Sequence, residues 1–406
     1  MLIAMTGANG LLGRNLLLEI IKQNYKNLSD LEVFVFGRST NSETLHKRII
    51  GILSEEAFDY INDKDVEKDE LIKILSEKIK CFEFNLGEPS NKVSEDDLKK
   101  LSSKEIDFFF HVASLTDFRD GELVKARLEK TNIIGTNQVL ESLPKMNIKE
   151  FAHVSSAYVC GAKSGKVDPN YIDFNQKFRN PYEMTKLKAE HNVRTFCSKN
   201  SIKFKIFRPS TICGRLIENR IGATPKFDVF YSWAAFFLRY KEKVLAGKSD
   251  VFDTPIDVSL RFYFSPTGGL NIVPVDFVAK FIYQASIQQN RNQSYHICND
   301  EEVPHELYTS LMLKTVNVNG VKNVYSRPTD LNQFEAFYYK TVGKIFTPYI
   351  TQDPILFDLN STREVCANAN LFCPKIDEAA FTEIMKYAKT KSFGGFNIKK
   401  ESLNTV

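Results

Sequence analysis

The sequence predicts an α/β protein: a doubly wound parallel sheet with a smaller C-terminal substrate-binding region. The first observation is a buried strand at residues 2–5, followed by a glycine-rich turn, a helical run and a β-rich run at 31–39, which together form one βαβ unit. The second is that helical stretches separate further expected strands, at residues 80–84, 107–112, 150–155 and 203–207. The third is the length of 406 residues, 43% of them hydrophobic, which suffices for one large domain or two smaller ones.

The other elements follow in order along the chain. Residues 14–24 carry leucines and isoleucines at helical spacing, and residues 40–79 form a long, charged, mostly helical connection. After Gly214 the alternation breaks down in a stretch rich in aromatic residues, proline and glycine, which marks a second region. A strand-then-helix pattern resumes at 271–285, and the tail from Phe396 is expected to be frayed.

Charge and cysteine content exclude several classes of function. The 54 basic and 50 acidic side chains are interleaved and give a net charge of +4, so we expect no nucleic-acid partner. The strongest apolar run, Val229 to Leu238, is half the roughly 20 residues that a membrane span requires, so a buried helix or pocket wall is expected there. The 7 cysteines are scattered without a CxxC pair, which is typical of reduced thiols in a cytoplasmic protein. The histidines have no ligand-like spacing, so no metal is predicted.

The segment MTGANGLLGRNLL, residues 5–17, places glycines at GxxGxxG spacing between a strand and a helix. Gly7 permits a tight exit from the strand, Gly10 lets the backbone approach a pyrophosphate, and Gly13 permits close packing of helix and strand. The helix N-terminus supplies N–H donors and positive potential to phosphates. We therefore expect a dinucleotide site here rather than a plain structural turn.

The end of the second strand decides the choice of cofactor. An acidic residue there would bind the adenine ribose of NAD, but this chain has Gly37, Arg38 and Ser39. The guanidinium of Arg38 can bind a 2′-phosphate in bidentate fashion, which predicts NADPH. The alternative is a surface arginine beside NAD. Arg14 and Arg48 are either further cofactor contacts or ordinary exposed basic residues.

Two domains are therefore expected. Residues 1–212, rejoined by 270–285, would form the NADP-binding Rossmann domain, and residues 213–406 mostly the substrate-binding region. The aromatic-rich stretch from Phe227 to Phe264 is either a wall of the substrate site or the ordinary hydrophobic core of that region.

Two segments carry the chemistry of carbonyl reduction: HVSSAYVCG, with Ser155 and Ser156, and NPYEMTKLKAE, with Tyr182 and Lys186. Side chains four positions apart share one face of a helix, so the phenol and the ammonium are expected to be neighbours. A phenol is normally too weak an acid to donate a proton near neutrality, and a nearby ammonium lowers its pKa. We expect Tyr182 to donate the proton, Lys186 to lower the phenol pKa and hold the nicotinamide ribose, and Ser156 to stabilise the developing oxyanion.

Taken in order, the motifs resemble those of the extended short-chain dehydrogenase/reductase superfamily: TGANGLLG, HVAS, TNIIGTN, HVSSAYVCG, YEMTK, RPSTICG and NIVPVDFVA. The resemblance covers about the first 285 residues. GRS after the second strand, HVSSAYV and NIVPVDFVA together resemble the thioester-reductase and fatty-acyl reductase, or male-sterility, branch most. Members of that branch use NADPH to reduce acyl thioesters to aldehydes or alcohols.

The resemblance implies roles for further residues. Asn132 would be the structural and proton-relay asparagine, Ala113 and Ser114 would flank the cofactor, and Pro209 and Ser210 would form a loop beside the nicotinamide. Where the family has Gly-Asp-Leu near the adenine, this chain has Phe84, Asn85 and Leu86, and an asparagine oxygen can still accept a hydrogen bond from the adenine amino group. The expected catalytic residues are Ser156, Tyr182, Lys186 and Asn132. The expected cofactor-binding residues are Thr6, Gly7, Asn9, Gly10, Leu11, Leu12, Gly13, Arg38, Arg48, Asn85, Leu86, Ala113, Ser114, Asn132, Ser155, Tyr182, Lys186, Pro209 and Ser210.

The expected function is NADPH-dependent reduction of an acyl thioester, held by a carrier protein or coenzyme A, to an aldehyde or alcohol. Four alternatives stay open. A nucleotide-sugar epimerase is disfavoured by Arg38, and a sugar dehydratase by Ala157 and Tyr158, which stand where the resemblance calls for an Asp-Glu pair. A simple carbonyl reductase would use the same residues. A non-catalytic redox sensor would be favoured by loss of Tyr182 or Lys186, and both are present.

The partners expected are the substrate and an acidic carrier protein. Basic residues beside the expected acyl site would dock that carrier or the phosphates of coenzyme A, or else form a solvated face: Arg215, Arg220, Lys226, Arg239, Lys241, Lys243 and Lys248. Either a monomer or a homodimer is expected, by analogy with the fold.

Overall fold

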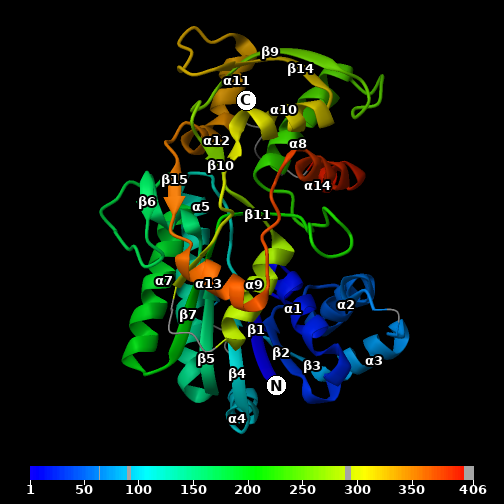
Figure 1. The fold of residues 1–406 in the computed structure, drawn as a ribbon, viewed down its shortest axis with the longest axis vertical. Coiled ribbons are helices and arrows are strands. Elements are labelled where there is room, and N and C mark those ends of the chain that lie inside the picture. The colour runs from blue at the N-terminus through cyan, green and yellow to red at the C-terminus, as the bar shows by residue number, and fades with distance from the viewer. Residues whose placement is uncertain (64, 89–92, 289–293, 397–406) are drawn as a thin grey trace.

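The computed structural model describes residues 1–63, 65–88, 93–288 and 294–396. Its centre is a seven-stranded sheet in the order β12-β7-β5-β4-β1-β2-β3, and every pair of neighbouring strands is parallel. The sheet lies in the lower half of Figure 1, and a second layer of helices and short strands stands above it. The predicted doubly wound parallel sheet is confirmed.

The strands of this sheet match the hydrophobic pattern of the sequence. Each strand expected between residues 2 and 207 overlaps an observed one. The seventh, β12, was not expected because it is only four residues long, and it extends the sheet beyond residue 285. The strands are β1 (Leu2–Thr6), β2 (Glu32–Gly37), β3 (Ile79–Glu83), β4 (Glu105–His111), β5 (Asn147–Val154), β7 (Lys203–Pro209) and β12 (Ser294–Ile297).

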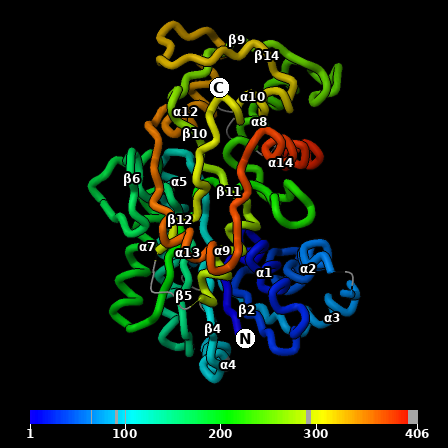
Figure 2. Tube along the Cα trace, viewed as in Figure 1, coloured from blue at the N-terminus to red at the C-terminus, as the bar shows by residue number. Residues whose placement is uncertain are grey.

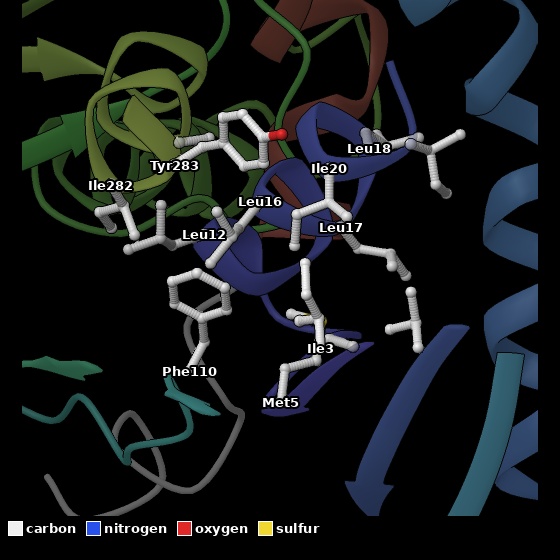
Figure 3. Close-up of a cluster of buried hydrophobic side chains, with 14 of the residues drawn as sticks. Ile3, Met5, Leu12, Leu16, Leu17, Leu18, Ile20, Phe110, Ile282 and Tyr283 are labelled. Atoms are coloured by element: carbon white, nitrogen blue, oxygen red, sulfur yellow. The ribbon is translucent and has the colours of Figure 1, made fainter. Parts of the chain in front are cut away.

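Helices cover both faces of the sheet. Successive residues of a strand point to opposite sides, so a strand that is hydrophobic throughout presents an apolar face to each side. Ile3 and Met5 of β1 point into one core, which the leucines of the first helix fill (Figure 3). Leu2 and Ala4 point into the other. The first face is covered by α1 (Leu11–Asn24), α2 (Leu45–Ile61), α3 (Lys68–Lys78), α9 (Val275–Ile287) and α13 (Asn360–Ala369). The second is covered by α4 (Glu95–Ser102), α6 (Gly135–Ser142) and α7 (Pro181–Lys199).

A separate hydrophobic core lies above the sheet, around α8 (Phe230–Leu245). The apolar run 229–238 falls in this buried helix, as predicted. Trp233 lies 5.1 Å from Phe262 and 5.0 Å from Phe346 between ring centroids. The other elements of this layer are α10 (His305–Thr315), α11 (Gln333–Lys340), α12 (Val342–Ile350), α14 (Glu378–Thr390), α15 (Ser392–Phe396), β9 (Ile256–Tyr263) and β14 (Val318–Val324).

Several short elements connect the two layers, and the tube in Figure 2 shows the chain crossing between them repeatedly. After α12, β15 pairs with β6 in parallel, and α13 then packs against the sheet. The connecting elements are α5 (Glu122–Leu128), β6 (Gly165–Val167), β8 (Thr211–Cys213), β10 (Gly269–Leu270), β11 (Ile272–Pro274), β13 (Val303–Pro304) and β15 (Ile355–Phe357). Short 3₁₀ or π turns lie at Tyr25–Asp30, Glu129–Ile134, Leu143–Lys145 and Ala157–Cys160.

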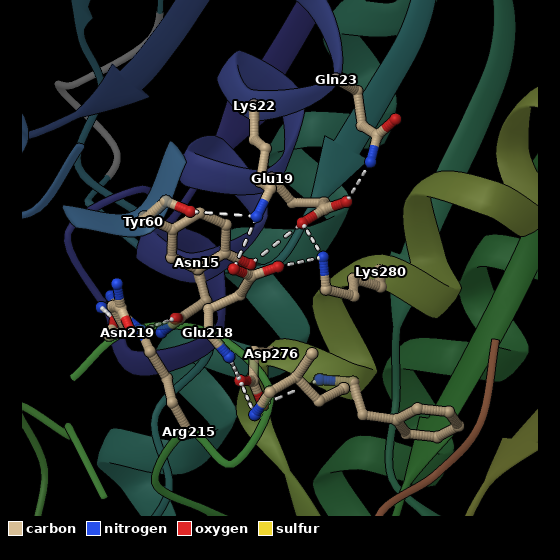
Figure 4. A network of polar contacts seen from close by, with 12 residues as sticks. Asn15, Glu19, Lys22, Gln23, Tyr60, Arg215, Glu218, Asn219, Asp276 and Lys280 are labelled. Atoms are coloured by element: carbon tan, nitrogen blue, oxygen red, sulfur yellow. Dashed lines mark hydrogen bonds and ion pairs between the residues drawn. The ribbon is translucent and has the colours of Figure 1, made fainter. Parts of the chain in front are cut away.

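A buried polar network fastens the connection after β8 to the helices α1 and α9 (Figure 4). The carboxylate of Asp276 accepts hydrogen bonds from the backbone N–H groups of Leu216, Ile217 and Glu218 at 2.7 to 3.2 Å. The Nε of Arg215 donates to Asn15 Oδ1 on α1 at 2.6 Å. The connection that follows β8 is therefore held against the helix that begins at the glycine loop.

The sequence predicted a frayed C-terminal tail and no membrane span. The fraying expected from Phe396 concerns residues 397–406, which lie outside the described part of the chain. Within the described part, every helix is too short or too polar to cross a bilayer.

Candidate active site

The candidate site lies where the winding of the sheet reverses. From β1 the chain proceeds to β2 on one side, and β4 on the other side of β1 leads to β5. In sheets of this kind the carboxyl ends of the two strands at the reversal border a crevice that binds ligands. The loops after β1, β4 and β5 carry most of the residues singled out from the sequence.

The glycine loop has the geometry that a dinucleotide requires. Gly7 has a φ of +78°, and a Cβ there would lie 2.7 Å from the backbone nitrogen of Ala113. A Cβ on Gly13 would lie 2.0 Å from the carbonyl oxygen of Gly7, so only glycine lets α1 approach β1 this closely. The helix begins at Leu11 with no side-chain cap and no acidic residue in its first turn, so side chains do not occupy its first N–H groups. These residues fit the pyrophosphate of a dinucleotide.

Thr6 connects the end of β1 to the end of β4 through hydrogen bonds. Its hydroxyl pairs with His111 Nδ1 at 2.8 Å and accepts a hydrogen bond from the N–H of Ala113 at 3.2 Å. The other ring nitrogen of His111 lies 3.0 Å from the hydroxyl of Thr136. Burial, with a smaller effect of the charge of Lys186, lowers the pKa of His111 to about 3, so the imidazole is neutral at physiological pH. Sequence reasoning missed His111 as the link between the glycine loop and α6.

Basic side chains gather at the far end of the glycine loop. Arg38 is exposed, and its guanidinium has no hydrogen-bond or ion-pair partner in the parts of the chain that the structure describes. Arg48 donates from Nη1 to the carbonyl oxygen of Arg38 at 3.0 Å. When the amide of Asn9 is turned so that its oxygen faces Arg48, it accepts from Nη2 at 2.8 Å. Arg14 instead forms an ion pair with Glu56 at 2.7 Å.

As expected, the residues at the end of β2 include no carboxylate. A carboxylate of the neighbouring strand β3 nevertheless approaches this end. Glu83, the last residue of the neighbouring β3, accepts hydrogen bonds from the N–H of Ser39 at 3.0 Å and from its hydroxyl. The sequence could not reveal this approach, because Glu83 lies 44 positions from Ser39. Glu83 is therefore engaged in shaping the turn after β2.

Ser156, Tyr182 and a third hydroxyl meet beyond the end of β5. Tyr182 lies in the first turn of α7, which Asn180 caps by accepting from the N–H of Glu183 at 3.2 Å. Burial raises the pKa of Tyr182 to about 12, while hydrogen bonding to the hydroxyls of Ser156 and Thr116 acts in the opposite direction. The sequence pointed to Ser156 but not to Thr116, which lies in the loop after β4. Hydroxyls from three separate segments thus converge.

Lys186 lies one turn further along α7 than Tyr182. Its ammonium donates to the carbonyl oxygen of Val154 at 2.7 Å, and burial lowers its pKa to about 8. Burial has the largest effect on the pKa of Tyr182 and raises it, so the expectation that Lys186 lowers this pKa stays a prediction. The ammonium is directed at the end of β5.

Asn132 holds the loop after β4 against α7. It lies in the π-helical turn at Glu129–Ile134, where its Oδ1 accepts from the N–H of Leu115 at 2.7 Å. Its Nδ2 donates to the carbonyl oxygen of Leu115 at 3.0 Å and to the hydroxyl of Thr185 at 3.3 Å. Both ends of the amide are used in this way, so Asn132 positions the segment that carries Thr116.

The remaining predicted residues line the same edge of the sheet. Ser155 donates its N–H to Phe207 at 2.7 Å, and Ser210 donates its hydroxyl to Asn271 at 2.7 Å. A Cβ on Gly135 would lie 2.8 Å from the Cβ of Leu86. The others stand beside these: Leu11 and Leu12 in the first turn of α1, Asn85 after β3, Ser114 after β4 and Pro209 at the end of β7.

Two of the basic residues expected to dock a carrier are buried. Arg215 is buried and pairs with Glu56, and Lys241 is buried and donates to the carbonyl oxygen of Val316 at 2.7 Å. Arg220 pairs with Asp59, and Lys226 pairs with Asp228. The docking face is therefore wrong for Arg215 and Lys241, which are buried, and it stays a prediction for the other five residues.

An apolar cavity of about 30 Å³ lies near Tyr182, which contacts one residue of the cavity wall. The ring of Phe118 stands edge-on to Tyr182 at 5.1 Å and forms part of the cavity wall. Val229, Phe230 and Trp233 also line it. Most of the aromatic stretch from Phe227 to Phe264 belongs to the upper core, as one interpretation predicted, and that it forms a wall of the substrate site stays a prediction.

Comparisons with known proteins agree with this geometry. A family model described as "Male sterility protein" matches residues 5–282. A linear gramicidin synthase chain of Brevibacillus parabrevis is 22% identical over 398 residues, which are 94% of this chain and 7% of that protein. Fatty acyl-CoA reductase 2 of Bos taurus is 27% identical over 158 residues, 38% of this chain and 28% of the reductase. The chain thus spans only a small part of these two relatives.

Solved structures share the fold over nearly the whole chain. The terminal R domain from the myxalamid PKS-NRPS biosynthetic pathway has a TM-score of 0.69 at 18% identity and covers 97% of this chain and 91% of its own. A thiolation-reductase di-domain from an archaeal non-ribosomal peptide synthetase has a TM-score of 0.65 at 18% identity, covering 98% and 76%. UDP-glucuronic acid 4-epimerase from Bacillus cereus, in complex with NAD, has a TM-score of 0.57 at 17% identity, covering 96% and 99%.

Proposed function

Because the chain belongs to the male sterility protein family, we propose that it is an NADPH-dependent reductase that converts an acyl thioester to an aldehyde or alcohol. Membership in this family supports an oxidoreductase that uses a nicotinamide cofactor. The observation that carries the proposal is the convergence of the Ser156 and Tyr182 hydroxyls beside an apolar cavity, at the carboxyl edge of the sheet.

The hydroxyls account for carbonyl reduction in a direct way. When bound, NADPH supplies the hydride. Ser156 and Tyr182 donate hydrogen bonds to the carbonyl oxygen as negative charge develops on it, and such preorganised donors lower the barrier in a site that excludes water. Burial raises the pKa of Tyr182 to about 12, so the phenol keeps its proton near neutrality. The proposed role of the Lys186 ammonium is to lower this pKa so that the phenol can give its proton to the oxyanion. Asn132 holds the loop that carries Thr116 in place.

The direct test is NADPH oxidation against a panel of acyl-CoA thioesters, acyl-carrier thioesters, aldehydes and UDP-sugars. We expect turnover with thioesters and production of an aldehyde or alcohol. A carrier protein is the proposed acyl donor, since one structural neighbour is a thiolation-reductase di-domain and one relative is a linear gramicidin synthase chain. Epimerisation of a UDP-sugar without thioester turnover would favour the second candidate function, a nucleotide-sugar epimerase. The fold shared with UDP-glucuronic acid 4-epimerase supports this candidate.

We expect Arg38→Asp to weaken NADPH binding about 30-fold and to leave NADH binding unchanged or slightly stronger. The guanidinium of Arg38 is exposed and has no partner among the described residues, so we propose that it binds the 2′-phosphate. Arg48 donates a hydrogen bond to the backbone carbonyl of Arg38. Titration of the apoprotein with each cofactor measures the effect. Lys47→Asp on α2 makes the same charge change beside the site and should leave both affinities unaltered. Equal weakening in the two variants would rule out a specific phosphate contact.

Activity should depend on the protonation of Lys186. Since burial lowers its pKa to about 8, the ammonium is lost as pH rises through that value, and kcat/KM for the thioester should fall above about pH 8. Lys186→Arg keeps a positive charge at higher pH, so its alkaline limb should move upward by more than one pH unit, whatever its absolute rate. An unchanged limb in this variant would show that another group titrates.

A further inference from the structure

The cavity beside Tyr182 is an aromatic slot with a mouth and a closed floor. We use the name aromatic slot for the cavity walled chiefly by Phe118, Tyr158, Trp233, Tyr308, Phe346 and Tyr349. The walls come from the loops after β4 and β5 and from α8, α10 and α12. The slot is therefore assembled between the catalytic helix and the upper core, and no single segment of the chain encodes it.

The mouth of the slot faces the proposed reacting carbonyl. Phe118 contacts Tyr182 at 5.1 Å on one side and Tyr349 at 6.0 Å on the other, and Tyr158 contacts Tyr349 at 5.7 Å. These three wall residues are only partly buried. A group attached to a carbonyl at Tyr182 would thus enter between them.

The floor of the slot is closed by side chains of the upper core. Trp233 and Tyr308 are 1% and 0% exposed. Trp233 stacks on Phe346 at 5.0 Å and meets Phe262 at 5.1 Å. The volume of about 30 Å³ compares with about 10–15 Å³ for a single water-sized sphere, so the slot holds only a few atoms before its floor must move. A long chain would have to displace core rings.

The walls offer no free hydroxyl to a ligand. The hydroxyl of Tyr158 lies 3.1 Å from that of Thr211, and Tyr308 lies 2.9 Å from His305 Nδ1. Tyr349 donates to Glu183 at 2.8 Å and accepts from Asn180 at 2.6 Å. Because their polar atoms are satisfied, these tyrosines present ring surface alone, which suits an apolar occupant.

One wall residue is held in a strained conformation. Val229 lines the slot at the start of α8 with a φ of +52°, a region that β-branched residues rarely adopt. Such strain persists where the surrounding structure over-determines it, and it concentrates at ligand sites. The conformation of Val229 at the edge of the slot is therefore imposed by the surrounding structure, and the cavity is not a packing defect.

We propose that the aromatic slot selects a short apolar acyl end, such as butanoyl, and that Trp233 is the specificity-determining residue that rejects long chains. The proposal rests on the proposed function, because it assigns the slot to the group attached to the thioester carbonyl. It sets this chain apart from an enzyme for long fatty acyl chains.

The single tryptophan of the sequence reports on the slot without any chemistry. Amide analogues of acyl pantetheine resist reduction, and butanoyl, octanoyl and dodecanoyl analogues would be titrated against the full chain while Trp233 fluorescence is followed. We expect a saturable spectral change with the butanoyl analogue and at least about tenfold weaker binding of the dodecanoyl analogue. No response to any analogue, or tightest binding of dodecanoyl, would overturn the proposal.

A specificity switch tests the floor. Trp233→Leu should raise the ratio of kcat/KM for dodecanoyl over butanoyl thioester at least about tenfold, because it opens space below the slot. Phe381→Leu is the matched control: Phe381 contacts Phe230 and Tyr308 in the same core but does not line the slot, so the ratio should stay constant. An equal change in both variants, or none in Trp233→Leu, would overturn the role of Trp233.

The two kinds of readout separate the slot from the reaction. A fluorescence response to the butanoyl analogue without turnover of any thioester would support the slot and refute the proposed function. Thioester turnover that rises with chain length, with no fluorescence response, would refute the slot and leave the proposed function standing.

Discussion

Tyr182→Phe is expected to lower kcat for thioester reduction by about 10²–10⁴-fold, the usual contribution of a positioned proton donor. The substitution removes one hydroxyl and retains the ring that packs against Phe118 at 5.1 Å. Cofactor affinity and thermal stability should therefore change little. Steady-state kinetics with a saturating thioester, together with NADPH titration, distinguishes a loss of chemistry from a loss of binding.

A matched control for this substitution is available near the same helix. Tyr171→Phe removes a hydroxyl that donates to Asp173 at 3.2 Å, away from Ser156 and Tyr182. Its activity should equal that of the unaltered protein. If Tyr182→Phe keeps more than about half of the original kcat, the phenol is not the proton donor and the proposed chemistry fails.

The largest loss of stability is expected for Glu190→Ala, which should lower the free energy of unfolding by about 3–5 kcal/mol. Glu190 and Arg208 are both 0% exposed, and Arg208 donates to the two carboxylate oxygens at 3.0 and 2.7 Å. Removing the carboxylate leaves a buried guanidinium without its counter-ion. Denaturant unfolding followed by circular dichroism measures the change.

The pKa of Glu190 gives this pair a pH signature. Burial has the largest single effect and raises the pKa, but the charge and hydrogen bonds of Arg208, together with Arg194 and Ser155, outweigh it, so the net pKa lies below the ordinary value for glutamate. The stabilisation is therefore complete above about pH 4.5 and is lost as pH falls through the lower folded-state pKa. The Glu190→Ala variant should lack this acid-dependent component.

An exposed ion pair provides the comparison. Glu95 pairs with Lys145 at 2.9 Å, and their side chains are 83% and 53% exposed. Glu95→Ala should leave the unfolding midpoint unchanged, because solvent screens such a pair. Equal losses in Glu95→Ala and Glu190→Ala would mean that burial of the Arg208 pair contributes nothing.

Local sequence signals were sufficient for the sheet and the glycine loop. The strand at residues 2–5, the turn and the helix behind it are specified by side-chain periodicity, by the positive φ of Gly7 and by the close approach of Gly13 to the backbone of Gly7. The same holds for Tyr182 and Lys186, which one helix must place on one face. β12 was missed because four residues carry too little periodic signal.

Interactions between distant segments misled or escaped the sequence reasoning. In the sequence Arg215 and Lys241 resemble surface cations, but both are buried. Arg215 pairs with Glu56, and Lys241 donates to the carbonyl oxygen of Val316. The high pKa of Tyr182 reflects how much protein surrounds it, which no spacing along the chain records.

By itself, the sequence determined the doubly wound architecture, the dinucleotide turn and the helix that carries the phenol and the ammonium, since each depends on residues close together in the chain. The tertiary structure alone decided that Thr116 joins Ser156 and Tyr182, and that Phe118, Trp233 and Tyr349 enclose one slot. The reason is physical: periodicity sets which face a residue occupies within its own element, whereas packing of remote elements sets which faces meet.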